Sequence, residues 1–155
     1  MIAAYEYNFI TGASELLGLV ENKYRLYILH KPVEYEVRFD TGILHVRTEA
    51  GFEFDGRSGP AIIDWFAPNL GSIYEKVAWH MHDALGYAQS LSFANTNYAL
   101  KYFLRDIVGY SKFKSELIRK AVSLSSDWYG VPMPNDRWFC NIDKVSTRWY
   151  ERKTN

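Results

Sequence analysis

Residues 33–39 read VEYEVRF and alternate strictly between apolar and polar side chains, which is the period of a β-strand with one buried face. Asp40-Thr41-Gly42 follows as a plausible hairpin turn. Residues 43–48, ILHVRT, then return antiparallel to the first strand. Upstream, residues 24–30 are also rich in β-favouring side chains. We therefore expect an antiparallel meander over residues 24–54 with one buried face.

Residues 55–71 interrupt this pattern with several glycines and prolines, which predicts a long irregular loop. Loops of this length in a compact domain are usually functional or disordered. The loop also carries apolar residues, among them Trp65, so we expect it to pack against the domain.

From residue 72 the period changes to that of an amphipathic helix. Ser72 and Glu75 have the spacing of a capping box, in which the glutamate reaches back to the serine amide. Gly86 predicts the end of this helix. Its apolar face is formed by Ile73, Val77, Met81 and Ala84.

Two further helices are expected. The first covers residues 95–108, with Asn95 or Thr96 at its start and Gly109 after it. The second covers residues 112–127 and is capped by Ser111. Its inward side chains are expected to be Phe113, Leu117, Ala121 and Leu124. The fold class is therefore α+β, with a small N-terminal antiparallel β-meander followed by about three helices.

The composition fits one domain over residues 1–155, because 48% of the residues are apolar and can form a core. Aromatic residues make up 17% of the chain. They are frequent in the tail, residues 128–155, which we expect to pack on the domain rather than to be disordered. The single Cys excludes an intramolecular disulfide framework and a Cys-rich zinc site.

Basic and acidic residues number 18 each, so the formal net charge is zero. This balance argues against broad binding to nucleic acid or to anionic membranes, although a local basic patch can survive it. The tail mixes basic and aromatic residues, but acidic neighbours dilute any nucleic-acid signal. No signal peptide and no membrane-spanning apolar run are visible, so we expect a soluble protein.

Candidate chemistry is concentrated in Trp79-His80-Met81-His82-Asp83, within the first expected helix. On a helix His80 and His82 diverge by about 200°, so they cannot chelate one metal ion together. An adjacent His-Asp pair has a different use. His82 can act as a general base, and Asp83 can bind a divalent cation such as calcium. The competing interpretation is a buried His hydrogen-bonded to backbone and an Asp in a surface ion pair.

The stretch around this pair carries a longer pattern. It combines a glycine-aromatic strand end, a loop with Asp, Ser and Pro, and the His-Asp helix: Gly51, Phe52, Asp55, Ser58, Pro60, Trp65, His82, Asp83 and Tyr87. It resembles the domain of unknown function numbered thirteen fifty-three, which tailed phages and their prophages carry. The resemblance covers about residues 50–125. It implies a phage-encoded protein of the host cytoplasm or the virion, without an established activity.

The sequence departs from that family at several positions. Arg57 and Gly59 replace small or aliphatic residues, and Tyr87 comes one residue late. Asn97 stands on the following helix where the family is expected to have Asp. The resemblance thus gives Asn97 the place of a partner to His82, although an amide does not stabilise an imidazolium as a carboxylate does.

A second likeness is local. Residues 55–60 and 81–87 are similar to the loop and the His-Asp helix of bacterial phospholipases of the secreted A2 type. In those enzymes the His activates water and the next Asp helps to bind calcium. This chain lacks their disulfides and has one extra residue before Gly86. The likeness suggests roles for His82 and Asp83.

Two functional hypotheses follow. In the first, the chain is a metal-assisted hydrolase, or derives from one, and cleaves an ester, peptide or phosphoester bond. His82 is then the base, Asp83 the metal ligand or orienter, and Asn97 the partner. The wall of the binding site would be formed by Asp55, Gly56, Ser58, Pro60, Trp65, Trp79 and Tyr87. In the second, a non-catalytic phage protein binds a host or virion protein through exposed aromatic residues, and the His-Asp pair is structural.

Overall fold

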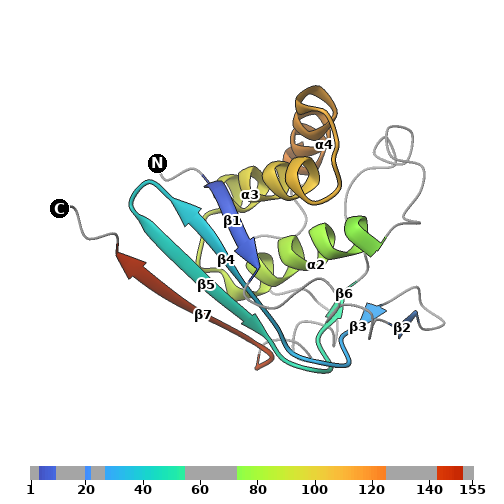
Figure 1. The fold of residues 1–155 in the computed structure, drawn as a ribbon, viewed down its shortest axis with the longest axis vertical. Helices are drawn as coiled ribbons and strands as arrows, with labels where there is room; N and C mark the ends of the chain where they lie inside the picture. The colour runs from blue at the N-terminus through green and yellow to red at the C-terminus, as the bar shows by residue number, and fades with distance from the viewer. Residues whose placement is uncertain (1–3, 10–19, 22–26, 55–72, 125–142, 152–155) are drawn as a thin grey trace.

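The computed structural model describes residues 4–9, 20–21, 27–54, 73–124 and 143–151. These residues form two antiparallel sheets and three helices, which confirms the α+β class expected from the sequence. Figure 1 shows helices α2 and α3 beside the larger sheet and α4 beyond α3. None of the described helices is long and apolar enough to cross a bilayer.

The larger sheet has the strand order β1-β4-β5-β7, and all neighbours are antiparallel. Its strands are β1 (Ala4–Phe9), β4 (Val33–Phe39), β5 (Gly42–Thr48) and β7 (Val145–Glu151). The hairpin of β4 and β5 is confirmed, with its turn at Asp40 and Thr41. Alternate residues of both strands are buried, so one face of the sheet covers the core.

The smaller sheet has the order β2-β3-β6, formed by Val20–Glu21, Tyr27–Ile28 and Glu53–Phe54. The strand expected over residues 24–30 is thus confirmed only at Tyr27–Ile28, and residues 24–26 lie outside the described part. Strand β7 was not expected from the sequence. It places residues 145–151 of the tail at one edge of the larger sheet.

Helix α2 (Ile73–Ala88) packs its apolar face on the larger sheet. Val77, Met81 and Ala84 are buried, as predicted. The Tyr35 hydroxyl of β4 donates a hydrogen bond of 2.8 Å to the Met81 carbonyl oxygen, which ties the sheet to the helix. The predicted end at Gly86 is wrong, because the helix continues to Ala88. The chain leaves it at Gln89, whose φ is 52°.

Helix α3 (Phe93–Asp106) begins earlier than predicted. Its N-cap is Ser92, whose extended backbone lets the hydroxyl accept a hydrogen bond from the Asn95 amide. The prediction of Asn95 or Thr96 at the start is therefore wrong. Both residues lie buried in the helix.

Helix α4 (Lys112–Leu124) is capped by Ser111, as predicted, because the hydroxyl accepts the Lys114 amide at 3.1 Å. The predicted inward face is wrong at two positions: Phe113 is 74% exposed and Leu124 is 83% exposed. The position of α3 selects another side of the helix. That side buries Ser115, Ile118, Ala121 and Val122.

Candidate functional site

Helix α2 carries the cluster singled out in the sequence into the interior of the domain. His82 is 1% exposed and Asp83 is 2% exposed, and His80 is also fully buried. The two histidines diverge, as helix geometry requires. His80 contacts Thr48 of β5, whereas His82 contacts Asn97 of α3.

The contact between His82 and Asn97 belongs to a hydrogen-bonded chain across three helices. Nε2 of His82 lies 2.9 Å from Oδ1 of Asn97. The Asn97 amide nitrogen donates to the Ser123 hydroxyl of α4 at 3.2 Å. That hydroxyl donates in turn to the Arg119 carbonyl oxygen at 2.8 Å. The hydroxyl hydrogen is thus used, so Ser123 can only accept from Asn97.

This chain fixes the tautomer of His82. Because the amide nitrogen of Asn97 faces Ser123, its oxygen must face His82. Nε2 therefore carries the hydrogen and donates it to Asn97. In a neutral imidazole the other nitrogen, Nδ1, is then the basic one.

Asp83 places a carboxylate beside that basic nitrogen. Its Oδ1 lies 3.7 Å from Nδ1 of His82, and the two groups form an ion pair whenever the imidazole is protonated. The Trp79 ring meets the His82 ring edge-on, with centroids 5.9 Å apart. The interpretation of Asp83 as half of a surface ion pair does not fit this burial. The arrangement provides a base, an orienting amide and a carboxylate in one interior site.

His80 occupies a different environment. Its Nε2 lies 3.1 Å from the Thr48 hydroxyl, which itself donates to the Val33 carbonyl oxygen. The rings of Phe52 and Phe54 pack on it at centroid distances of 5.4 and 5.2 Å. This burial lowers the pKa of His80 to about 3, so the imidazole is neutral at physiological pH. His80 therefore supports the junction between α2 and the sheets.

The remaining predicted site residues are only partly described. Trp79 is buried against His82, whereas the Tyr87 ring meets Phe52 edge-on at 5.6 Å, on the His80 side of the helix. The structure thus joins His82, Asp83, Asn97 and Trp79, and it places Tyr87 with the aromatic rings around His80. Other predicted residues lie outside the described part of the chain: Asp55, Gly56, Ser58, Pro60, Trp65 and Ser72.

The described residues contain no cluster of the side chains that most often ligate metal ions. In this part of the chain no group of three or more His, Cys, Asp or Glu side chains could hold an ion. Asp83 contributes one carboxylate, so a calcium ion there would take its other ligands from backbone or amide oxygens, from water, or from residues outside the described part.

Two residues of the site had no signal in the sequence. Ser123 fixes Asn97, and Thr48 contacts His80, yet each is a lone hydroxyl on a distant element. The sequence predicts that Glu75 reaches back to the Ser72 amide, which lies outside the described residues, and it gives no signal for a second partner of Glu75. The Tyr110 hydroxyl donates to its buried carboxylate at 3.2 Å.

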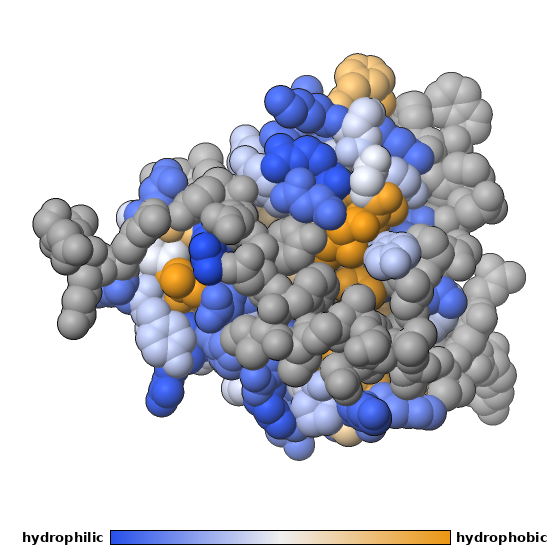
Figure 2. All heavy atoms as spheres, viewed as in Figure 1, coloured by the Kyte–Doolittle hydropathy of each residue, from blue (hydrophilic) through white to orange (hydrophobic). Residues whose placement is uncertain are grey.

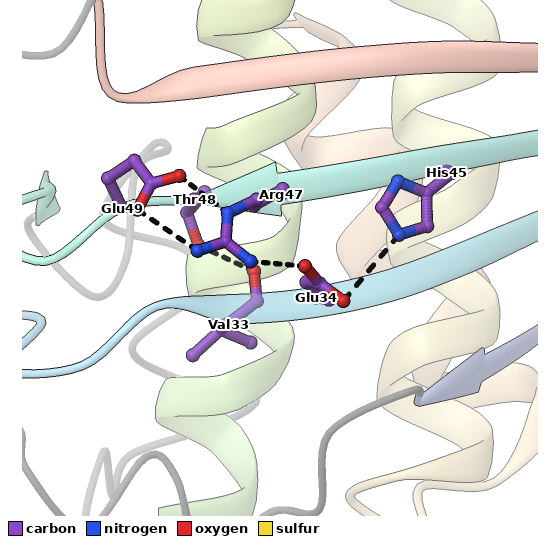
Figure 3. A network of polar contacts seen from close by, with 6 residues as sticks. All are labelled: Val33, Glu34, His45, Arg47, Thr48 and Glu49. Carbon is purple, nitrogen blue, oxygen red and sulfur yellow. Dashed lines mark hydrogen bonds and ion pairs between the residues drawn. The ribbon is translucent and has the colours of Figure 1, made fainter.

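A second polar network lies on the opposite face of the larger sheet (Figure 3). Arg47 bridges Glu34 of β4 and Glu49, and His45 lies 3.9 Å from Glu34. The hydrogen bonds to Glu49 and Glu34 raise the pKa of Arg47, which stays positively charged. These residues alternate with the buried ones along the strands. His45 is therefore separated from His82 by the sheet.

No family model, curated protein or solved structure significantly matches the chain. Its function is therefore inferred from the geometry of the site and from the motif in its sequence.

Proposed function

We propose that this chain is a small hydrolase, or a protein derived from one, in which His82 is the general base. The observation that carries the proposal is the hydrogen bond from His82 to Asn97, because it leaves Nδ1 basic and beside the Asp83 carboxylate. The phage-type motif extends the proposal to a phage-encoded protein of the host cytoplasm or the virion.

The chemistry follows from the two nitrogens of the imidazole. Nδ1 takes a proton from water, and the resulting hydroxide attacks the carbonyl or phosphoryl centre of the substrate. Asp83, 3.7 Å away, stabilises the imidazolium that forms, while Asn97 holds the Nε2–H in place. The imidazolium then returns its proton to the leaving group. An ester, peptide or phosphoester fits this sequence of steps.

Burial places a condition on this mechanism. Since His82 and Asp83 are almost completely shielded from solvent, water and substrate reach Nδ1 only when the site opens. Buried polar groups cost stability unless they are hydrogen-bonded. Three such residues at one helix junction, His82, Asp83 and Asn97, break the apolar pattern of the core. Polar residues at positions where the fold would favour apolar ones are expected at functional sites.

No step of this mechanism passes through a metal ion. In this mechanism Asp83 stabilises the imidazolium of His82. In the alternative assignment its carboxylate would bind calcium instead. Thermal melting separates the two assignments. A calcium-dependent rise in the melting temperature that Asp83→Asn abolishes would assign Asp83 to the cation instead.

The experiment that tests the proposal is a hydrolysis screen with the full chain. Chromogenic esters, phosphoesters and peptides are offered to the wild type, to His82→Gln and to the control His45→Gln. We expect one substrate class to be cleaved, with a loss of at least about 100-fold in His82→Gln and no change in His45→Gln. Equal rates in all three proteins, or no cleavage of any class, would contradict the proposal.

A second candidate function is favoured by the same burial. A non-catalytic phage protein would keep the hydrogen-bonded His82 for structure and bind a host or virion protein through exposed aromatics. Trp149 and Tyr150 of the edge strand β7 are exposed. His82→Ala would then lower the free energy of unfolding by about 1–3 kcal/mol, with no activity to lose. Because His82 is buried, His82→Ala lowers stability whether the protein is a hydrolase or a binding protein. The hydrolysis screen distinguishes these two functions.

A further inference from the structure

The outer side of α4 exposes apolar side chains that the fold does not use. Phe113 and Leu124 are more exposed than any other large apolar side chain in the described residues. Leu117 lies between them and is half-buried. Large apolar groups standing in water usually mark a surface that becomes covered.

Helix geometry places these residues on one line. Positions 113, 117, 120 and 124 are spaced by four, three and four residues, so their side chains fall within about 60° of one another around the helix axis. Lys120 completes the line. We name this set the α4 stripe: Phe113, Leu117, Lys120 and Leu124.

Among the described helices, α4 lies farthest from the larger sheet. The buried side of α4 packs on α3, which separates it from the larger sheet (Figure 1). In Figure 2 an apolar group protrudes at the top of the molecule, where Figure 1 places α4, beside hydrophilic groups. The stripe thus lies on the side of α4 that α3 does not cover.

The charge around the stripe is positive. Helix α4 carries Lys112, Lys114, Arg119 and Lys120 against the single acid Glu116. Hydrogen bonds from Arg119 and Lys101 lower the pKa of Glu116 to about 2, so this carboxylate stays ionised, and its charge is offset by the two basic groups that it pairs with. Lys112 and Lys120 are exposed beside the apolar residues. The surface therefore favours a negatively charged partner.

We propose that the α4 stripe docks on an anionic lipid surface. Phe113 and Leu124 enter the boundary between headgroups and acyl chains, and Lys112 and Lys120 bind the phosphates. An apolar line with lysines beside it is the pattern of a helix that lies in a membrane interface, which favours a lipid surface as the partner. The aliphatic stem of Lys120 can lie along the apolar residues while its ammonium reaches the headgroups.

This docking is local and reversible. The chain has no net charge, so the attraction depends on the lysines of α4 rather than on the whole molecule. A stripe with three apolar side chains gives weak binding that salt reduces. The proposal does not depend on the chemistry of His82. If both hold, Ser123 connects the docked helix to the site through Asn97.

Co-sedimentation with vesicles tests the proposal. The full chain is mixed with phosphatidylcholine vesicles, with or without phosphatidylglycerol. We expect binding only to the anionic vesicles, weakened by added salt. Phe113→Ser with Leu124→Ser should reduce partitioning at least about tenfold, and each of Lys112→Glu and Lys120→Glu about fivefold or more. Tyr150→Ser, an exposed aromatic on β7, is the matched control and should bind like the wild type.

Several results would overturn the proposal. One is that the wild type does not bind to phosphatidylglycerol vesicles. Another is that the double variant with Phe113→Ser and Leu124→Ser binds to them as well as the wild type does. A lipid-free dimer that this variant abolishes, in a protein that ignores vesicles, would assign the stripe to a second copy of the chain. All substituted side chains are exposed, and circular dichroism confirms that each variant is folded.

Discussion

The side-chain oxygen of Asn97 lies 2.9 Å from Nε2 of His82 and joins α3 to α2 inside the domain. Because Ser123 holds the nitrogen of the same amide, this bond determines both the orientation of Asn97 and the tautomer of His82. The remaining nitrogen of the imidazole faces Asp83. The proposed hydrolase depends on this relationship.

Asn97→Ala should destabilise the protein by about 1–3 kcal/mol, because it leaves the Nε2–H of His82 buried without its acceptor. Urea unfolding measures the change. Asn95→Ala is the matched control, since Asn95 is buried on the same helix and its side-chain oxygen has no hydrogen-bond partner among the described residues. We expect a smaller loss for this control. Equal losses would show that the bond to His82 contributes nothing specific.

His80 should make stability depend on pH. Burial lowers its pKa to about 3 in the folded protein, whereas its ordinary value is 6.5. Below pH 6.5 the unfolded chain therefore binds a proton that the folded chain does not. The free energy of unfolding should fall by about 1.4 kcal/mol per pH unit as pH decreases toward 3. His80→Gln should lack this pH-dependent loss of stability. Denaturant titrations of both proteins at several pH values measure the free energy of unfolding.

Glu116 adds a second pH-dependent contribution to stability, which wild type and His80→Gln share and which cancels in their difference. Hydrogen bonds from Arg119 lower its pKa from 4.5 to about 2, so its stabilising contribution is present above 4.5 and is lost as pH falls through 2. The contribution is small because the pair is partly exposed. Between pH 6.5 and 4.5 the difference between wild type and His80→Gln reports on His80. Parallel pH profiles in that range would contradict the prediction.

Gly42→Ala should destabilise the sheet by about 1–3 kcal/mol through overpacking. A Cβ atom on Gly42 would lie 2.5 Å from the Tyr150 carbonyl oxygen and 2.7 Å from the Trp149 ring. The carbonyl belongs to the backbone of β7 and cannot yield without moving the strand. Thermal melting compares this variant with Thr41→Ala, a change at the exposed turn beside it. Equal melting temperatures would mean that β7 is not held against Gly42.

The sequence predicted the parts of the fold that are encoded locally. The hairpin of β4 and β5 has a strict two-residue period and a short turn between its strands, so neighbouring residues suffice to define it. Strand β7 pairs with β5 from the far end of the chain, and its VSTRWYE sequence lacks that alternation. Such non-local pairing leaves no periodic signal.

The orientation of α4 shows a second limit. Phe113, Leu117, Ala121 and Leu124 satisfy the helical period, and so do Ser115, Ile118 and Val122. Only the position of α3 decides between the two faces. The preference for apolar residues placed Phe113 and Leu124 inward, which is wrong, whereas Ala121 is buried as predicted, because the buried face includes small and polar side chains.

The candidate site was predicted in part. The motif named His82 and Asp83, and the resemblance added Asn97, which the structure places against His82. The roles of Ser123 and Thr48 depend on how α4 and β5 pack against other elements. A hydroxyl gives no sequence signal of the distant group that it contacts.

The most direct test of His82 as a base is the protonation of its two ring nitrogens, measured by long-range proton–nitrogen NMR at neutral pH. Our account predicts a hydrogen on Nε2 and none on Nδ1, a pattern that Asn97→Ala should disturb while His45 is unaffected. A spectrum with the hydrogen on Nδ1 would contradict it, because the nitrogen beside Asp83 could not then accept a proton from water.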